Sequence, residues 1–356
     1  MALLLTHLPA HISAYVFLFS DGSFAQRLRE ASLPVTIVPV SEAVSNSTRE
    51  QPTVKGVLEV PTVAWKLAAL FRENDIDVVH AHTVKAHFIG GIAARFAGLP
   101  FVTHWRDILE GRARLAMRLL SQACATERIA LSHAVSNTYD LPPTNIIYEP
   151  IDVAAYRDVP SKRGARERLG LPQDAQVVGI IGRINRWKGH DRFLRIAARV
   201  RETVSAHFAI IGAPVFRDAD FVDELHRMVR ELGLEGSVTF IPWMNDVLDA
   251  YASMDVHCNC STREPLGRTI LEAAACGVPS VCFDDGGAPE AIPSPESGVA
   301  IPPGDEAAFA GAVTAYLTDP AKYAAASAAG LIAVNAYDVS VHVQQVADVY
   351  QRATTV

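Results

Sequence analysis

Residues 177–189 read Val177-Val178-Gly179-Ile180-Ile181-Gly182-Arg183-Ile184-Asn185-Arg186-Trp187-Lys188-Gly189. The apolar run Val177–Ile181 does not alternate with polar residues, which is typical of a strand buried on both faces of a parallel sheet. A basic turn follows, and Asp191–Arg201 then has the amphipathic spacing of a helix. A buried strand, a glycine-containing turn and a helix in this order predict the first unit of a doubly wound α/β domain.

The same alternation continues toward the end of the chain and predicts the rest of this domain. We expect the strand Phe208–Ile211, the helix Asp220–Leu232, the strands Val238–Ile241 and Asp255–Asn259, the helix Leu266–Ala275 and the strand Ser280–Phe283. The segment from Glu306 onward is rich in alanine and predicts helices. Ligands of such sheets bind at the carboxyl ends of the strands, so functional residues are expected there.

Strands and helices also alternate in the first half. We expect strands at Ala14–Ser20, Val35–Val40, Val78–His82, Pro100–His104 and Asn145–Tyr148, and helices near Gly22–Ala31, Pro61–Asn74 and Val84–Ala97, the last ended by Gly98 as a cap. The sequence therefore predicts an α/β fold with two Rossmann-like domains facing a cleft. The expected boundaries are 1–150 for an acceptor-side domain, 151–335 for a donor domain, and 336–356 for a C-terminal helix that packs back on the first domain.

The beginning of the chain departs from this pattern. A doubly wound domain opens with a strand, whereas Ala2–Leu8 has the pattern of a helix. The N-terminal domain is therefore expected to lack its first strand and the turn that follows. A truncated or misassigned start is the preferred explanation, and a domain that truly lacks this strand is the alternative.

Composition excludes several classes of protein. Of the 356 residues, 49% are hydrophobic and 20% are charged, as in a globular chain long enough for two domains. The net charge of −7 argues against a nucleic-acid partner. The cysteines have no metal-type spacing and fit buried free thiols in a reducing compartment; they are Cys124, Cys258, Cys260, Cys276 and Cys282.

The expected location is the cytoplasm, including the inner face of the cytoplasmic membrane. No apolar run approaches the roughly 20 residues of a membrane span, and no signal-peptide pattern stands at the start. A basic cluster accompanies the leucine-rich stretch Leu115–Leu120 and is a candidate contact for anionic lipid or a phosphate-linked acceptor, with a solvated helix face as the alternative. It consists of Arg106, Arg112, Arg114 and Arg118. A monomer or a homodimer is expected.

Two glutamates eight residues apart, Glu264 and Glu272, follow the expected strand Asp255–Asn259. Pro265 fits the first turn of a helix, whose free N–H groups form an anion site. With both glutamates on that helix, about 12 Å would separate them along its axis. This spacing fits a ligand with hydroxyl groups at both ends and anionic groups between them, such as a nucleotide sugar.

The turn quoted first supplies the positive charge that such a ligand needs. Gly182 allows the backbone to approach a ligand closely. Arg183 and Lys188 can offset the charge of a diphosphate, arginine through a forked pair of hydrogen bonds and lysine as a point charge. A basic surface turn is the alternative interpretation of these residues taken alone.

These motifs together resemble the glycosyltransferases of family 4, a family of retaining enzymes with the two-domain GT-B fold. The family's Glu-x7-Glu element corresponds to Glu264 and Glu272, and its diphosphate loop corresponds to Gly182, Arg183, Lys188 and Gly189. Further matches are Gly277-Val278-Pro279, the pair Gly286-Gly287 with Glu290, and Val238 with Phe240 near the nucleobase pocket. The resemblance covers roughly residues 75–350.

The resemblance implies transfer of a sugar from a UDP- or GDP-sugar with retention of configuration, without a metal ion or a cofactor other than the co-substrate. The acceptor would be a sugar, a glycolipid or a small molecule, in bacterial polysaccharide, glycolipid or secondary-metabolite synthesis. The implied donor-binding residues are Gly182, Arg183, Lys188, Phe240, Pro242, Glu264, Leu266, Gly267, Arg268 and Glu272. Pro265-Leu266-Gly267 stands where the family often has Gly-Phe-Gly, and Pro242 where it often has Gly, so donor preference is not implied.

The catalytic candidates are Glu264, Arg183 and Lys188, together with His104 and Arg106 of the first half. Many family members place a histidine near His104, close to the reacting sugar, and either His104 or Arg106 would steady the leaving phosphate or the acceptor. A strand-end histidine bonded to backbone is the alternative. His80 and His82 match a common His-x-His of the family, and because no third ligand is obvious near them, no metal site is expected.

Three other functions remain as alternatives. A sugar-nucleotide epimerase of the same fold would bind the same donor without an acceptor. A non-catalytic nucleotide-sugar binding protein would fit the missing first strand. A nicotinamide oxidoreductase also uses Rossmann domains, but the sequence has no Gly-x-Gly-x-x-Gly after an expected strand.

Overall fold

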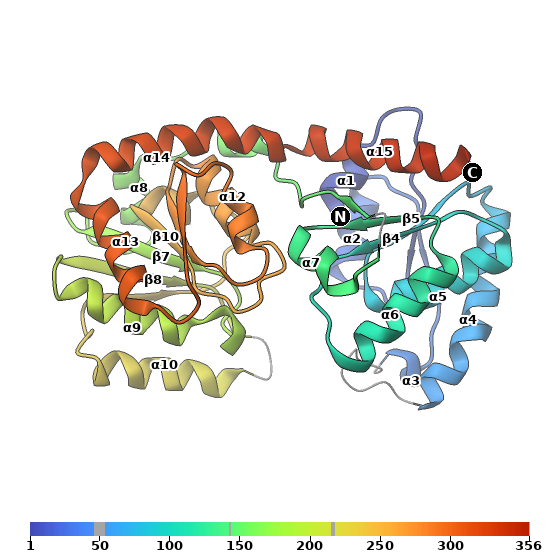
Figure 1. Cartoon of the computed structure of the whole chain (residues 1–356), viewed down its shortest axis with the longest axis horizontal. Coiled ribbons are helices and arrows are strands. Elements are labelled where there is room, and N and C mark those ends of the chain that lie inside the picture. Colours follow the sequence, from blue (N-terminus) through green and yellow to red (C-terminus); the bar gives the residue numbers. More distant parts are fainter. Residues whose placement is uncertain (46–53, 142–143, 215–217, 356) are drawn as a thin grey trace. The chain divides into compact units, whose positions relative to one another are not determined.

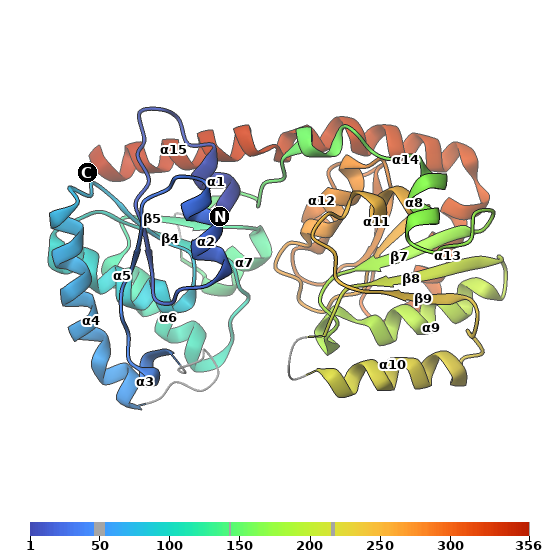
Figure 2. The same cartoon turned by 180° about the vertical axis from the view of Figure 1, so that it is seen from behind.

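The computed structural model describes residues 1–45, 54–141, 144–214 and 218–355. The chain divides into two compact units, which we call unit 1 (Met1–Pro150 with Val339–Val356) and unit 2 (Ile151–Asp338). Figures 1 and 2 show the elements of both units from opposite sides.

Unit 2 is built on a parallel sheet with the strand order β12-β11-β10-β7-β8-β9. Because the chain order reverses between β7 and β10, this is the doubly wound arrangement predicted from the sequence. The strands are β7 (Gln176–Ile181), β8 (Ala206–Ile211), β9 (Val238–Ile241), β10 (Val256–Asn259), β11 (Ser280–Phe283) and β12 (Gly298–Ile301).

Helices cover both faces of this sheet, so β7 is buried on both sides as its unalternated sequence predicts. Val178 and Ile180 belong to a core shared with α9, α10 and α13, whereas Val177 and Ile181 belong to a core on the side of α11 and α12. The helices are α8 (Lys162–Arg168), α9 (His190–Arg201), α10 (Ala219–Glu231), α11 (Leu248–Ser253), α12 (Arg268–Ala275), α13 (Glu306–Thr318) and α14 (Pro320–Ala333). Shorter 3-10 turns are η1 (Val153–Tyr156), η2 (Arg186–Lys188), η3 (Ala288–Ala291) and η4 (Val334–Tyr337).

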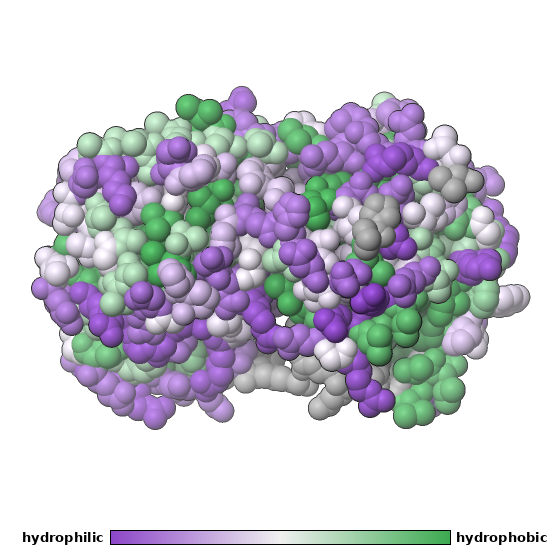
Figure 3. Space-filling view, in the orientation of Figure 1, coloured by the Kyte–Doolittle hydropathy of each residue, from purple (hydrophilic) through white to green (hydrophobic). Residues whose placement is uncertain are grey.

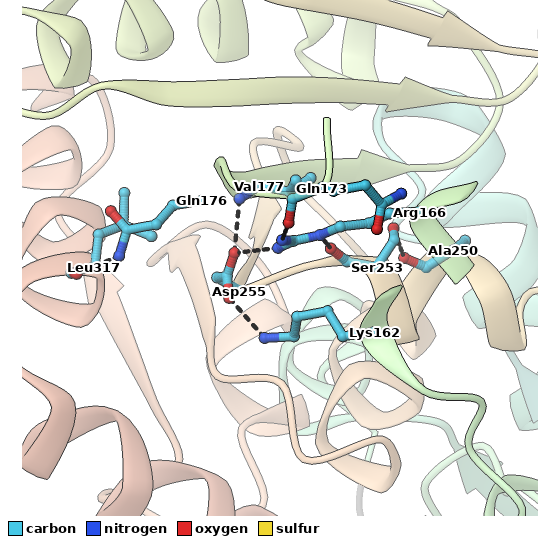
Figure 4. A network of polar contacts seen from close by, with 9 residues as sticks. All are labelled: Lys162, Arg166, Gln173, Gln176, Val177, Ala250, Ser253, Asp255 and Leu317. Atoms are coloured by element: carbon cyan, nitrogen blue, oxygen red, sulfur yellow. Dashed lines mark hydrogen bonds and ion pairs between the residues drawn. The ribbon is translucent and has the colours of Figure 1, made fainter. Parts of the chain in front are cut away.

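An ion-pair network ties the amino ends of β7 and β10 together (Figure 4). One carboxylate oxygen of Asp255 accepts from the Lys162 ammonium at 2.6 Å, and the other accepts from Arg166 and from the Val177 backbone N–H, both at 2.7 Å. Arg166 also donates to the carbonyls of Ser253 and Gln173. This network lies at the sheet edge opposite the carboxyl ends of the strands and is structural.

Unit 1 contains two parallel sheets among its described residues: β1 pairs with β2, and β3, β4, β5 and β6 follow one another in order. The strands are β1 (Val16–Leu18), β2 (Val35–Ile37), β3 (Val79–Ala81), β4 (Phe101–Trp105), β5 (Glu127–Ala130) and β6 (Asn145–Ile146). The helices are α1 (Ala2–Thr6), α2 (Ser23–Glu30), α3 (Glu42–Ser45), α4 (Val54–Glu73), α5 (Val84–Ala97), α6 (Gly111–Cys124), α7 (His133–Tyr139) and α15 (Val339–Thr355).

The beginning and the end of the chain meet in one core of unit 1. Leu4 of α1 is buried together with Val102 of β4, Ile129 of β5 and several valines of α15. The helix expected over the first residues is therefore present as α1. In the part of the chain that the structure describes, no helix combines the length and the apolar character that a bilayer span requires.

Several elements differ from the expectation. The strands β5 and β12 were not predicted, and in β5 the polar Glu127 and Arg128 hide the pattern of a buried strand. The helix expected from Pro61 begins earlier, at Val54, so that Pro61 lies inside α4. The helix expected from Leu266 begins only at Arg268, which changes the geometry of the site described next.

Candidate functional site

The turn after β7 is held against the ends of the two neighbouring strands. Gly182 has a φ of 155° and its N–H donates to the carbonyl of Ile211, the last residue of β8, at 3.0 Å. A Cβ on Gly212 would lie 1.9 Å from the Gly182 carbonyl oxygen, and a Cβ on Gly189 would lie 2.1 Å from that of Cys260. Side chains at these two glycines would therefore push the turn away from the ends of β8 and β10.

The position of Lys188 in this turn is fixed by several contacts. The Asn185 side chain accepts from the Lys188 backbone N–H at 3.1 Å, which closes the 3-10 turn η2. The Lys188 ammonium lies 2.6 Å from a carboxylate oxygen of Glu264 and 4.2 Å from the centroid of the Trp187 ring. An ion pair and a cation–π contact thus place one positive charge at the carboxyl edge of β7 and β10.

Glu264 is held on its other side by the segment after β11. Its backbone forms an isolated parallel bridge with Gly286, its N–H donates to the carbonyl of Asp285 at 3.2 Å, and its carbonyl accepts from the Gly287 N–H at 2.6 Å. A Cβ on Gly286 would lie 2.4 Å from the Glu264 carbonyl oxygen. Only 5% of Glu264 is exposed, so its carboxylate depends on Lys188 for charge compensation.

The expectation that Glu264 and Glu272 share one helix is wrong. Arg263 and Gly267 both adopt left-handed backbone conformations, with φ values of 47° and 91°, and α12 begins after Gly267 at Arg268. Glu264 therefore precedes the helix, and Pro265 is not in its first turn. No described side chain caps the first turn of α12, whose free N–H groups remain suited to an anion.

Glu272 lies within α12, and both of its carboxylate oxygens have partners. One oxygen accepts from the Tyr251 hydroxyl at 2.7 Å, and the other accepts from Arg268 one turn earlier on the helix at 3.1 Å. Burial, with the charge of Glu272, raises the pKa of Tyr251 well above its ordinary value. The neutral hydroxyl therefore remains a donor that fixes the orientation of Glu272.

The other residues expected at the donor site occupy different environments. Arg183 is exposed and forms no ion pair with any residue that the structure describes. Pro242 is exposed directly after β9, whereas Leu266 is buried. Phe240 is partly buried in β9, with its ring centroid 4.2 Å from that of His226 on α10. The expected contact between Phe240 and a nucleobase stays a prediction.

In unit 1, His104 lies within β4 and is completely buried, and Arg106 follows that strand and pairs with Glu149. The ring of His104 lies beside those of His80 and His82, with centroid distances of 5.3 and 5.1 Å. The expectation that these two histidines have no third ligand nearby is therefore wrong. Strands β3 and β4 are neighbours in the sheet, so His104 shares one face with His82 and His80, although it lies 22 and 24 positions after them in the sequence.

Several residues that position the site were not singled out from the sequence. Asn185 had a local signal, because an asparagine three residues before Lys188 is a capping pattern. Gly212 and Tyr251 gave no such signal, since their partners lie far away in the sequence. The same holds for Tyr350, whose hydroxyl lies 2.7 Å from the Nδ1 atom of His80.

Family models match both units of the chain. Residues 161–331 match the model for glycosyl transferases group 1, and residues 14–154 match the model for glycosyltransferase family 4. Among curated relatives, the D-inositol 3-phosphate glycosyltransferase 1 of Catenulispora acidiphila is 28% identical over 84% of this chain and 78% of its own length. The D-inositol 3-phosphate glycosyltransferase of Geodermatophilus obscurus is 30% identical over 70% of this chain and 62% of its own length.

Solved structures give a consistent result. The Anabaena protein Alr3699/HepE, solved in complex with UDP and glucose, has a TM-score of 0.82 and 28% identity, and the match covers 95% of this chain and 91% of that chain. The same protein was also solved with UDP-glucose. A glycosyltransferase from Rickettsia africae has a TM-score of 0.84 at 14% identity, covering 99% of this chain and 93% of that one, which supports the fold alone.

Proposed function

Because the chain belongs to glycosyltransferase family 4, whose members have the two-domain GT-B fold, we propose that it transfers a sugar from a UDP-sugar to an acceptor with retention of configuration at the anomeric carbon. The choice of UDP rests on the Anabaena relative, which was solved with UDP and with UDP-glucose. The acceptor class includes phosphorylated polyols, since the curated relatives are named D-inositol 3-phosphate glycosyltransferases, as well as sugars and glycolipids.

The pairing of Lys188 with Glu264 is the observation that carries this proposal. A diphosphate at the switch point between β7 and β10 would accept from Lys188, from Arg183 and from the free N–H groups of α12. Glu264 would then accept hydrogen bonds from hydroxyl groups of the sugar, and Glu272 from those of the ribose. Lys188, between carboxylate and phosphate, would offset the repulsion between them.

In the proposed reaction, the bond between the anomeric carbon and the phosphate oxygen breaks while the acceptor oxygen bonds to the same face of that carbon. The acceptor proton moves to an oxygen of the departing diphosphate, so no covalent enzyme intermediate and no other base are needed. The protein would contribute positioning and stabilisation of the developing charge on UDP. Arg183 and Lys188 would supply this stabilisation, and we therefore propose a metal-independent transfer.

The test has two stages. A thermal-shift panel of UDP-, GDP- and ADP-sugars on the whole chain is expected to give the largest stabilisation with a UDP-sugar. With that donor and an acceptor, Glu264→Gln is expected to lower kcat/KM by roughly 10- to 150-fold, because a hydrogen bond to a charged group contributes about 1.5–3 kcal/mol. Glu224→Gln is the matched control, since Glu224 pairs with Arg186 at the surface.

Product analysis separates this function from its alternatives. NMR of the product is expected to show the same anomeric configuration as the donor. Conversion of the donor sugar without an acceptor would instead indicate an epimerase. Donor binding with transfer unaffected by Glu264→Gln would point to a protein whose catalytic residues lie elsewhere or to a binding protein.

We further propose that unit 1 contacts anionic lipid through α4 and α6, which would place the enzyme at a membrane surface. Figure 3 shows a hydrophobic area on the side of unit 1 where Figure 1 places these helices. Exposed apolar side chains of these helices include Val57, Leu58 and Trp65 of α4 and Leu115 and Leu119 of α6. Basic residues accompany them on α6, which contains Arg112, Arg114 and Arg118 and no acidic residue. An apolar surface with basic neighbours fits a membrane with negative charge.

A further inference from the structure

Three histidines of unit 1 converge on one face of neighbouring strands. His80 and His82 are two residues apart, so they project from the same side of β3. The register pairs His80 with Val102 and Ala81 with Thr103, which brings His82 level with His104 of β4. The ring centroids of His80 and His82 lie 4.0 Å apart, and one ring nitrogen from each of the three histidines can be chosen so that all lie within 4.8 Å of one another.

Each of these three histidines has at least one buried ring nitrogen without a hydrogen-bond partner among the described residues. The Nε2 atom of His80, the Nδ1 atom of His82 and both ring nitrogens of His104 are buried and unpaired within the part of the chain that the structure describes. A buried polar atom without a partner costs about 1–3 kcal/mol. Native structures contain few such atoms, and a bound water or ion is a common explanation where they occur.

The surroundings of the cluster are compatible with a bound cation. His104 is completely buried, and His80 and His82 are half-buried. Metal ions bind imidazole through a ring nitrogen that carries no proton. The charge of Arg106 close by is offset by its ion pair with Glu149.

The Tyr350 hydroxyl provides an outer contact of the kind found around metal sites. It lies 2.7 Å from Nδ1 of His80, which fixes the ring and leaves the buried Nε2 atom available to a metal ion. Outer contacts of this type orient ligating histidines and select the nitrogen that binds the metal. Tyr350 belongs to α15, so the contact also links the last helix to β3.

We propose that His80, His82 and His104 bind a divalent transition-metal ion of the zinc class, with a fourth position open to water. Three imidazoles and a water are a common tetrahedral zinc set, with Zn–N distances of about 2.0–2.1 Å. Nitrogens in such a set lie roughly 3.4 Å apart, so small side-chain rotations would close the present spacing. His80 and His82 are partly buried, and His104 is fully buried. The site lies within unit 1, and its existence does not depend on the proposed glycosyl transfer.

The first experiment measures metal binding to the whole chain without an affinity tag. After treatment with EDTA and dialysis, titration calorimetry with Zn²⁺ is expected to show one site per chain. His82→Gln and His104→Gln are expected to weaken binding by at least about tenfold, because even loss of an outer contact typically costs 10–100-fold. Tyr350→Phe, which removes the outer contact, should weaken Zn²⁺ binding by about 10- to 100-fold. His11→Gln, at an exposed histidine of the same unit, is the matched control and should bind as the original chain does.

The second measurement does not depend on the folding of variants. Co²⁺ added to the EDTA-treated chain is expected to produce the intense visible absorption of a tetrahedral site with nitrogen ligands, and Zn²⁺ should abolish it. Weak absorption typical of octahedral cobalt, or equal Zn²⁺ affinity in the original chain and in folded His82→Gln, would overturn the proposal. Because neither readout involves sugar transfer, failure here is distinct from failure of the proposed function.

Discussion

At the scale of single residues, Arg183 and Lys188 carry the same charge but stand in different environments. Lys188 compensates the charge of Glu264, whose side chain is only 7% exposed, whereas Arg183 is exposed and has no ion-pair partner among the described residues. Both would contact the diphosphate in the proposed function, but only Lys188 also contributes to the stability of the ligand-free fold. The two substitutions therefore have different expected consequences.

We predict that Lys188→Ala and Arg183→Ala each weaken UDP binding by roughly 1–3 kcal/mol, measured by titration calorimetry. Lys188→Ala should also lower the free energy of unfolding by about 1–3 kcal/mol, since Glu264 would lose its partner, whereas Arg183→Ala should leave it unchanged. Arg186→Ala is the control, because Arg186 is in an exposed pair with Glu224. Unchanged UDP affinity in both variants would count against a diphosphate site at this turn.

The sequence predicts which residues form the site better than it predicts how they are arranged. The basic turn and Glu264 follow strands of a doubly wound sheet, so their meeting at one edge could be predicted. The position of Glu264 before the helix could not, because it depends on left-handed conformations at Arg263 and Gly267 that the sequence does not specify. The contact between Tyr350 and His80 spans 270 residues and is likewise invisible in local patterns.

At the scale of elements, helix α6 is the segment on which the proposed membrane contact depends. Leu115 and Leu119 lie one turn apart and are each 56% exposed. We predict that the double substitution Leu115→Ser with Leu119→Ser weakens binding to vesicles containing anionic lipid by at least about tenfold, because burial of a leucine contributes about 1.5–3 kcal/mol. Cosedimentation with vesicles measures this effect.

The control for this prediction is Ile332→Ser, at an apolar residue of α14 in unit 2 that is 75% exposed. That variant should bind vesicles as the original chain does. Binding should also weaken with added salt and on vesicles of neutral lipid alone, since screening reduces the attraction of the arginines. Equal binding of the Leu115/Leu119 variant and the original chain would exclude α6 as the contact.

The elements themselves were predictable where local signals are strong. Helix α5 begins after the cap Thr83 and ends before Gly98, which adopts the left-handed conformation, so its bounds matched the expectation. Strand β5 was missed because its sequence begins with two charged residues, and it is recognised only by its pairing with β4 and β6. Local propensity gave way to tertiary pairing in this case.

At the scale of the whole molecule, burial of histidines makes stability depend on pH. In unit 2, His190 and His257 are fully buried, and burial lowers their pKa values to about 4 and about 3 respectively, with the charge of Lys188 contributing in both cases. In the unfolded chain both groups return to a pKa of about 6.5. Between these values the unfolded state binds more protons than the folded state.

We therefore predict that the free energy of unfolding is unaffected by these two groups above about pH 7 and falls as the pH drops from about 6.5 toward 4. Each histidine contributes a slope of up to about 1.4 kcal/mol per pH unit in that window. Urea unfolding from about pH 7.5 to about pH 5, followed by circular dichroism in the presence of EDTA, measures the slope. His257→Asn should make the dependence of the unfolding free energy on pH shallower. His11→Asn, at an exposed position, should leave this dependence unchanged. Identical slopes in His257→Asn and the original chain would show that His257 titrates normally in the folded state.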